Sequence, residues 1–292
     1  MPPSVASVGT TAWRLGSTSN FTVTFDKPSG LAVGDLMVGC FFADSGTNAI
    51  TTLTLSGWTQ IGPGEAGSET SRLIQMRKVA VSADVAASDF TFTTNYSGSG
   101  GGKVGGAILR VTNFASSTTP VTITDEDAGR NATGASFTSF TGTFTPEFAN
   151  SLVLMMIAGT NNETGTGTFS GYTVSGTNLT WTEHFDIFDA DGDDAIFAVA
   201  SAVDTTTTTR TTASATCSVA QDDYILLMSS FLPIVNVSAD LPHLAITPSL
   251  EGITASQVNV ATNISNLSTT PTITGVETSV TQPSVWTNTP KS

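Results

Sequence analysis

Hydrophobic and polar residues alternate in many short runs of this chain, the pattern of strands with one buried face. In the run NFTVTFD, Phe21, Val23 and Phe25 share one face and threonine occupies the other. Phe90 and Phe92 repeat this arrangement farther along the chain. Clusters of glycine, proline and asparagine bound these runs, so the sequence predicts strands joined by turns.

Four other runs are apolar throughout, at residues 35–43, 105–111, 151–159 and 224–232. Short runs of this kind are typical of central strands that are covered on both faces. The best candidate for a helix, residues 79–89, is short and carries two serines. We therefore predict an all-β protein built as an antiparallel β-sandwich.

The strand pattern of the first half returns weakly in the second half. Residues 21–43 align with residues 137–159 at offsets of 116 to 119 residues. Trp58 corresponds to Trp181 at an offset of 123. A period this long indicates a duplicated β unit rather than a solenoid. Chance similarity between alternating strands is the alternative explanation.

The two halves could form one shared sandwich or two separate small ones. We favour one sandwich, because the stretch that joins the halves carries Val121 and Ile123 in strand alternation and differs from a featureless linker. A shared core is predicted to bury ten residues: Leu36, Val38, Phe42, Phe90, Phe92, Leu109, Leu152, Leu154, Phe197 and Leu226.

The character of the chain changes after Pro233, because residues 235–292 contain only isolated hydrophobic residues. A segment this poor in apolar side chains cannot build its own core. We expect an extended arm that packs on neighbouring subunits through Ile246, Ile253, Val260, Ile273 and Trp286. The predicted organisation is thus an N-terminal arm (1–19), a duplicated β-sandwich domain (20–234) and a C-terminal assembly arm (235–292).

Composition excludes several classes of protein. The 51 Thr and 33 Ser residues favour strands over helices, and only 12% of the chain is charged, with a formal net charge of −14. The ten Lys and Arg residues are spread singly and form no basic stripe for nucleic acid. No apolar run approaches the roughly 20 residues that span a bilayer, and the N-terminus lacks a secretory pattern. We expect no nucleic-acid binding and no membrane insertion.

The two cysteines, Cys40 and Cys217, lie in apolar or alternating runs. This is the usual setting of inert buried thiols, and a disulfide between them is the alternative.

The sharpest local motif is acidic: Asp189, Asp191, Asp193 and Asp194 surround Gly192. Closely spaced carboxylates suit Ca²⁺, but the glycine stands at the fourth position of the loop, where an EF-hand has it at the sixth. We prefer a solvated acidic hairpin and expect no cofactor. Calcium bound by Asp189, Asp191 and Asp193 is the alternative.

Strand alternation places five residues on one face: Leu179, Trp181, Glu183, Phe185 and Ile187. His184 falls on the opposite face. Glu183 could be a buried catalytic acid, but charged side chains are seldom buried without a partner, so we expect it at a sheet end that water reaches. The chain has no GxSxG elbow and no phosphate loop. We therefore assign no catalytic residue.

Trp58 and Trp181 occupy related places in the two halves. Exposed aromatic rings on a sandwich can stack on sugars, whereas core packing is the more common role of large aromatic residues. Core packing is the interpretation that we prefer, and glycan stacking remains open.

The order of the motifs GDLMVGCFFAD, SGWTQIG and AILRVTNF resembles a β-sandwich module of bacteriophage virion proteins and some bacterial surface proteins. NSLVLMMIAG and LTWT in the second half resemble a degenerate copy, although the glycine before the tryptophan motif is missing. The resemblance covers roughly residues 20–234 and implies a jelly-roll-like fold without carrying over any catalytic residue.

From these observations we expect a non-enzymatic structural protein of a bacteriophage virion: a head decoration, fibre-base or tail-associated component. Its expected partners are copies of itself and other virion proteins, and its expected location is the virion, after synthesis in the host cytoplasm. A glycan-binding adhesin that contacts host-surface glycans is the alternative. A jelly-roll glycosidase has only Glu183 and the acidic loop in its favour.

Overall fold

A computed structural model describes most of the chain before residue 234. The described residues are 1–16, 20–45, 52–66, 71–95, 102–114, 121–125, 137–144, 146, 149–161, 167–189, 194–208, 210–221 and 223–233. The predicted C-terminal arm, residues 235–292, lies outside them, as do its five proposed contact residues.

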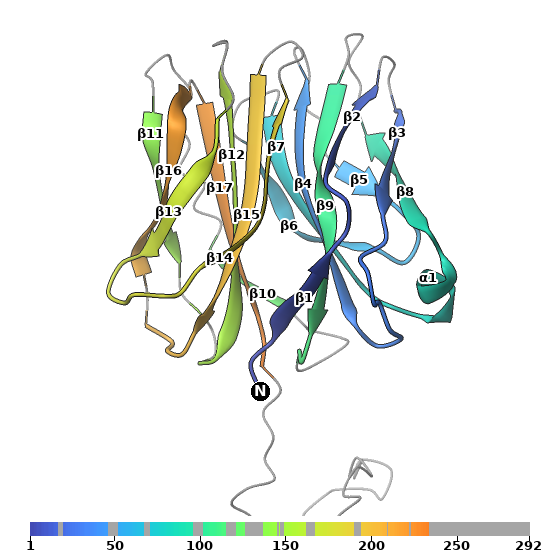
Figure 1. Ribbon diagram of the computed structural model, residues 1–292, viewed down its shortest axis with the longest axis horizontal. Helices are drawn as coiled ribbons and strands as arrows, with labels where there is room; N and C mark the ends of the chain where they lie inside the picture. The colour runs from blue at the N-terminus through green and yellow to red at the C-terminus, as the bar shows by residue number, and fades with distance from the viewer. Residues whose placement is uncertain are drawn as a thin grey trace, which may run out of the picture. The chain divides into compact units, whose positions relative to one another are not determined.

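The described residues form four antiparallel sheets, which confirms the predicted all-β class (Figure 1). Inner sheet I has the order β1-β9-β4-β7-β6, with β2 also on β9, and outer sheet I has the order β3-β8-β5. Inner sheet II has the order β10-β17-β12-β15-β14, and outer sheet II has the order β11-β16-β13. The strands of the first half are β1 (Ser4–Val8), β2 (Ala12–Gly16), β3 (Thr22–Asp26), β4 (Leu36–Ser45), β5 (Thr52–Thr54), β6 (Thr59–Ala66), β7 (Ser71–Val79), β8 (Asp89–Asn95) and β9 (Gly102–Thr112). Those of the second half are β10 (Val121–Asp125), β11 (Phe137–Phe144), β12 (Ser151–Asn161), β13 (Phe169–Val174), β14 (Thr182–Asp189), β15 (Asp194–Asp204), β16 (Arg210–Gln221) and β17 (Asp223–Phe231).

The two halves have the same connectivity. When β3 to β9 are matched in order with β11 to β17, and β1 with β10, the strand orders of the inner sheets coincide, and so do those of the outer sheets. One sheet of the first half contains β1-β9-β4-β7 and the other contains β3-β8-β5, which is the strand order of a jelly roll. β6 pairs with β7 and so extends the first of these sheets. The duplication seen in the sequence is therefore present in the strand topology.

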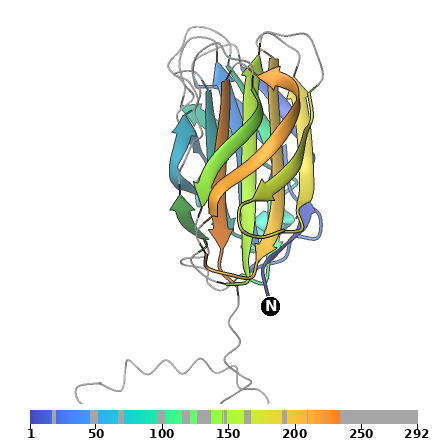
Figure 2. The ribbon, with the colours of Figure 1, turned by 90° about the vertical axis from the view of Figure 1, so that its left-hand side faces the viewer.

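The sheets stack in four layers, with the two inner sheets face to face and an outer sheet on either side (Figure 1). Figure 2 looks onto outer sheet II, whose strands cross obliquely in front of inner sheet II. Three apolar cores fill the spaces between the layers. The central core lies between the inner sheets, the first outer core within the first half and the second outer core within the second half.

All ten residues of the predicted core are buried, but they belong to three cores where we expected one. Phe90 and Phe92 pack in the first outer core, Leu226 packs in the second, and the other seven lie in the central core. Alternate residues of an inner strand point to opposite faces, so each continuous apolar run serves two cores. Each half is a sandwich of its own, and the central core joins the two halves.

Residues 1–19, which we expected to form an arm, contribute two strands to inner sheet I. β1 and β2 follow one another along the free edge of β9. Trp13 reaches the central core, where its ring packs edge-on against Phe42 at a centroid distance of 6.1 Å. Gly105 makes room for the indole, because a Cβ there would lie 2.5 Å from the Trp13 ring. Edge pairing and this aromatic contact hold the N-terminal segment in the sheet.

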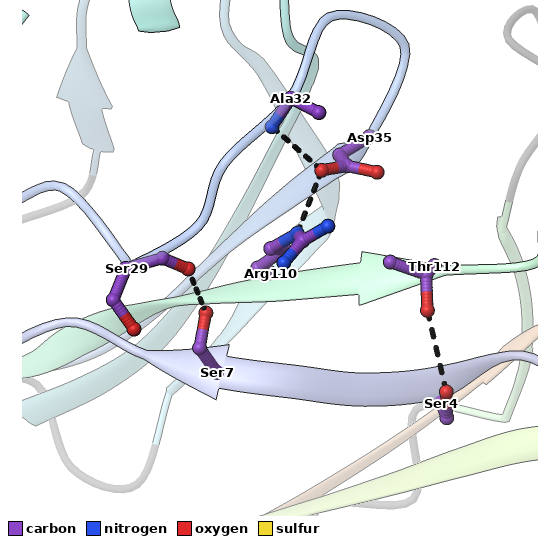
Figure 3. Close-up of polar contacts among 7 residues, drawn as sticks. All are labelled: Ser4, Ser7, Ser29, Ala32, Asp35, Arg110 and Thr112. Atoms are coloured by element: carbon purple, nitrogen blue, oxygen red, sulfur yellow. Dashed lines mark hydrogen bonds and ion pairs between the residues drawn. The ribbon is translucent and has the colours of Figure 1, made fainter.

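Polar contacts fasten the loop before β4 to β1 and β9 (Figure 3). The Arg110 Nε donates to Asp35 Oδ2 at 2.6 Å, and the same oxygen accepts from the Ala32 N–H at 2.8 Å. The Ser7 hydroxyl donates to the Ser29 carbonyl at 2.6 Å. The hydroxyls of Ser4 and Thr112, 3.3 Å apart, form a further contact between β1 and β9 (Figure 3).

The helix of the described region, α1 (Ser82–Ala86), lies within the stretch that the sequence singled out. Asp84 accepts a hydrogen bond from the Val81 N–H at 2.9 Å and forms an ion pair with Lys78 at 2.6 Å. No helix among the described residues has the length and apolar character needed to cross a membrane.

Candidate functional site

Trp58 is a core residue of the first half. Only 8% of it is exposed, and its ring packs edge-on against Phe90 and Phe92 at 5.5 and 5.1 Å. Its indole nitrogen is buried without a hydrogen-bond partner. The geometry matches core packing and leaves little ring surface for a sugar.

Trp181 is half-buried at the second outer core, where it lies 6.2 Å from the Tyr172 ring. The prediction that one face of the strand carries Leu179, Trp181, Phe185 and Ile187 is wrong. Leu179 and Trp181 pack against the second outer core, whereas Phe185 and Ile187 pack in or against the central core. The pairing of β14 with β15 shifts between Glu183 and Phe185, so His184 is an inserted bulge residue that reverses the alternation.

Glu183 is exposed near the start of β14, and its Oε2 accepts a hydrogen bond from the Tyr172 hydroxyl at 2.9 Å. Burial raises the pKa of Tyr172, and the neighbouring Glu183 charge raises it further. The pair is therefore a neutral phenol that donates to an exposed carboxylate.

The bulge places two perturbed groups on opposite sides of β14. Burial lowers the pKa of His184 to about 4, and its Nε2 lies 2.7 Å from the Ser201 hydroxyl. Burial raises the pKa of Asp186 to about 6, against the opposing effect of a 2.5 Å hydrogen bond from the Phe169 N–H. The other Asp186 oxygen, Oδ1, is buried without a partner. Burial thus shifts the ionisation equilibrium of each side chain toward its neutral form.

Asp189 lies at the end of β14, where its Oδ2 is 3.5 Å from Lys103 Nζ of the first half. Both side chains are largely buried, and the Lys103 ammonium also lies 5.7 Å from the centre of the Trp13 ring. This carboxylate is engaged across the central core. Asp191 and Asp193 lie outside the described residues, and in the part of the chain that the structure describes no three His, Cys, Asp or Glu residues group as metal ligands would.

Both cysteines are free and buried, as expected. Burial raises the pKa of the Cys40 thiol to about 12 and also raises that of Cys217. Thiols in this state are poor nucleophiles.

A groove of about 700 Å³ opens beside outer sheet I, and the sequence analysis missed it. We call it the threonine groove, because Thr52, Thr54, Thr91 and Thr93 line it. Its other described lining residues are apolar or uncharged polar: Leu53, Leu55, Ser56, Gly57, Trp58, Gln60 and Met76.

The groove exists because β5 ends early. The chain turns after Thr54 through a Trp58 N–H···O=C Leu55 bond of 3.0 Å, and Gly57 supplies the positive φ of 81° that this turn requires. β8 continues past the end of β5 to Asp89. Among the strands that the structure describes, none pairs with this side of β8 beyond Thr93.

A recurring triplet in the sequence could have drawn attention to this surface. β3, β5 and β8 each carry threonine, a hydrophobic residue and threonine, as TVT, TLT and TFT. The central residues Val23, Leu53 and Phe92 are buried in the first outer core, while the threonines face outward or the groove. The triplets are visible in the sequence, but the early end of β5 is not.

A smaller cavity of about 200 Å³ lies where β1 approaches inner sheet II, with Val5, Leu152, His184 and Ser201 in its wall. The His184–Ser201 contact already satisfies its central polar groups.

Neither a protein-family model nor a curated protein nor a solved structure matches this chain.

Proposed function

We propose that the chain is a non-enzymatic structural protein that acts through protein–protein assembly. We further propose that the assembly is a bacteriophage virion, where the chain is a head decoration, fibre-base or tail-associated component. Copies of itself and other virion proteins are its partners, and it is made in the host cytoplasm.

The observation that carries the proposal is the joining of two jelly-roll-ordered halves by a continuous buried core. Inner sheet II illustrates the result, since β12 pairs with β15 without a register shift from Ser151↔Asp204 to Asn161↔Asp194. Strands that are buried on both faces and paired along their whole length form a stiff block. A stiff block of this kind suits a building unit.

The virion assignment is supported by the order of strand motifs over residues 20–234. That order resembles the sandwich module of phage structural proteins, and the motifs fall on β4, β9 and β12 and at the starts of β6 and β14. The motifs occupy strands and turns of the scaffold, which fits a structural use of the module.

A glycan-binding adhesin is the second candidate, and the threonine groove favours it because hydroxyl groups can bond to sugars. The burial of Trp58 weighs against it, since only 8% of this residue is exposed and little ring surface is left for stacking on a sugar.

The proposal is tested with the purified full chain by sedimentation velocity over a wide range of concentration. We expect reversible association into a defined oligomer, and we expect mass spectrometry to detect the chain in purified phage particles. A chain that stays monomeric at every concentration and is absent from particles would contradict the proposal. Specific binding on a glycan array under those conditions would support the adhesin.

A further inference from the structure

The threonine groove has the features of an empty strand position in outer sheet I. The Thr94 N–H donates to Phe21 O on the β3 side at 2.9 Å. The N–H and C=O groups of successive residues point to alternate sides of a strand. Those of Thr91 and Thr93 therefore point away from β3, toward the side on which β5 lies. Thr93 pairs with Thr54, the last residue of β5, so Thr91 is the first residue whose main chain faces the groove.

The walls of the groove match what an added strand needs. Trp58 and Met76 provide an apolar floor that belongs to the first outer core, and Thr54, Thr91 and Thr93 form a hydroxyl rim. A strand placed beside β8 would turn alternate residues toward that floor and the others toward solvent. Strand addition of this kind combines main-chain hydrogen bonds with pockets for alternate side chains.

The C-terminal segment of the chain carries a fitting sequence. Residues 272–274 read Thr-Ile-Thr, the same pattern as the triplets of the three strands already in outer sheet I. In those strands the central residue enters the first outer core and the threonines stay outside it. Ile273 would occupy the apolar floor, with Thr272 and Thr274 at the rim. No charged side chain among the described lining residues opposes this uncharged triplet.

We propose that the threonine groove binds the Thr272–Thr274 segment of a neighbouring copy as an additional strand beside β8. The inference rests on the proposed assembly function and names the contact through which copies join. The occupant comes from a second copy because assembly requires a contact between chains.

Cysteine crosslinking between two full-length populations tests the contact. One population carries Thr91→Cys and the other carries Thr272→Cys or Thr274→Cys, so every such disulfide joins two copies. The native cysteines are buried and do not compete. We expect disulfide formation on mild oxidation, because facing side chains of paired strands lie about 5 Å apart. Thr173→Cys, an exposed threonine of outer sheet II, is the matched control and should not crosslink.

Association of the full chain is the second measurement. Ile273→Glu removes the apolar side chain of the proposed occupant, and Ser56→Trp fills the groove. Each variant should weaken association about tenfold or more. Ile273→Val and Thr173→Trp should leave association near that of the parent. Circular dichroism confirms that each variant is folded.

The outcomes separate this inference from the proposed function. If the full chain associates while the mixed populations give no disulfide above the control and Ile273→Glu has no effect, the groove contact is wrong and assembly stands. If a double variant with Thr91→Cys and Thr274→Cys crosslinks only within one chain, the neighbouring-copy assignment is wrong. If the full chain does not associate at all, the proposed function fails and this inference fails with it.

Discussion

The two halves of the molecule share one strand order, but the side chains that the structure describes in their outer cores differ. The first outer core is built on interlocked phenyl rings, with Phe41 at 4.7 Å from Phe25 and 5.2 Å from Phe92. Among the side chains that the structure describes, which do not include those of β11, the second outer core contains mainly aliphatic and small residues, including Met155 and Cys217. A duplicated topology therefore constrains where apolar residues stand and leaves their size and shape free.

Charged groups also differ between the halves. In the first half, the ion pairs Lys78–Asp84 and Arg110–Asp35 fasten loops at the end of the sandwich. In the second half, His184 and Asp186 are partly buried, which shifts the ionisation equilibrium of each toward its neutral form. The first half thus has ion pairs at its loops, whereas the second half has partly buried groups whose protonation depends on pH.

The largest difference should appear when each outer core is truncated. Phe41→Ala removes the ring that contacts two others, and we expect a loss of about 4 kcal/mol in the free energy of unfolding. Met155→Ala in the second outer core should cost about 2 to 3 kcal/mol, because less volume is removed and small neighbours can relax. Urea unfolding of both full-length variants measures the difference. Equal losses would show that ring packing adds nothing special to the first half.

A smaller effect is expected from the ion pair that joins the halves. Lys103→Met removes a cation from beside the largely buried Asp189 carboxylate, and we expect a loss of about 2 to 3 kcal/mol in the free energy of unfolding. Lys78→Met should cost about 1 kcal/mol, because Lys78 is more exposed and Asp84 keeps the Val81 hydrogen bond. Adding Asp189→Leu to Lys103→Met should recover most of the loss. A double variant that stays as unstable as Lys103→Met would contradict a desolvation penalty at Asp189.

The fold was predictable where local pattern decides the structure. Continuous apolar runs correctly indicated strands covered on both faces, since β4, β9, β12 and β17 are central strands of the two inner sheets. The pattern could not say what covers them, so four layers were mistaken for one sandwich. The contribution of the N-terminal segment was missed because it depends on Trp13 packing over Gly105, which lies far away in the sequence.

The candidate surfaces were less predictable, because single insertions and turns decide them. One bulge at His184 reverses the faces of β14, and an alternating sequence gives no sign of it. The groove depends on where β5 ends, which the Gly57 turn fixes. The sequence favoured core packing for Trp58 but left stacking on a sugar open. The contacts of its ring with Phe90 and Phe92 distinguish the two roles.

The pH dependence of stability separates the two perturbed groups of the second half. The folded-state pKa of His184, about 4, lies below its ordinary value of 6.5, so its contribution to stability is lost as pH falls from 6.5 toward 4. The folded-state pKa of Asp186, about 6, lies above its ordinary value of 3.8, so its contribution is lost as pH rises from 4 through 6. Between pH 4 and 6 the two groups therefore change the stability of the parent protein in opposite directions.

Two variants isolate these slopes, since all other titrating groups are shared with the parent. Relative to the parent, Asp186→Asn should gain stability as pH rises from 4 to 6, and His184→Gln should lose stability over the same interval. Thermal melting at closely spaced pH values measures both differences. Parallel curves for parent and variants would show that neither pKa is shifted by folding.

The smallest effect is expected at the outward hydroxyl pairs, where the halves should behave alike. The Thr24 and Thr91 hydroxyls lie 2.8 Å apart on outer sheet I, and those of Thr173 and Ser214 lie 2.8 Å apart on outer sheet II. Both pairs are exposed, so water replaces a lost partner at little cost. Thr24→Ala and Thr173→Ala should therefore each change the free energy of unfolding by about 0.5 kcal/mol or less. A markedly larger loss in one variant, measured by urea unfolding, would show that its outer sheet relies on the hydroxyl pair and that the halves differ on their solvent faces as well as in their cores.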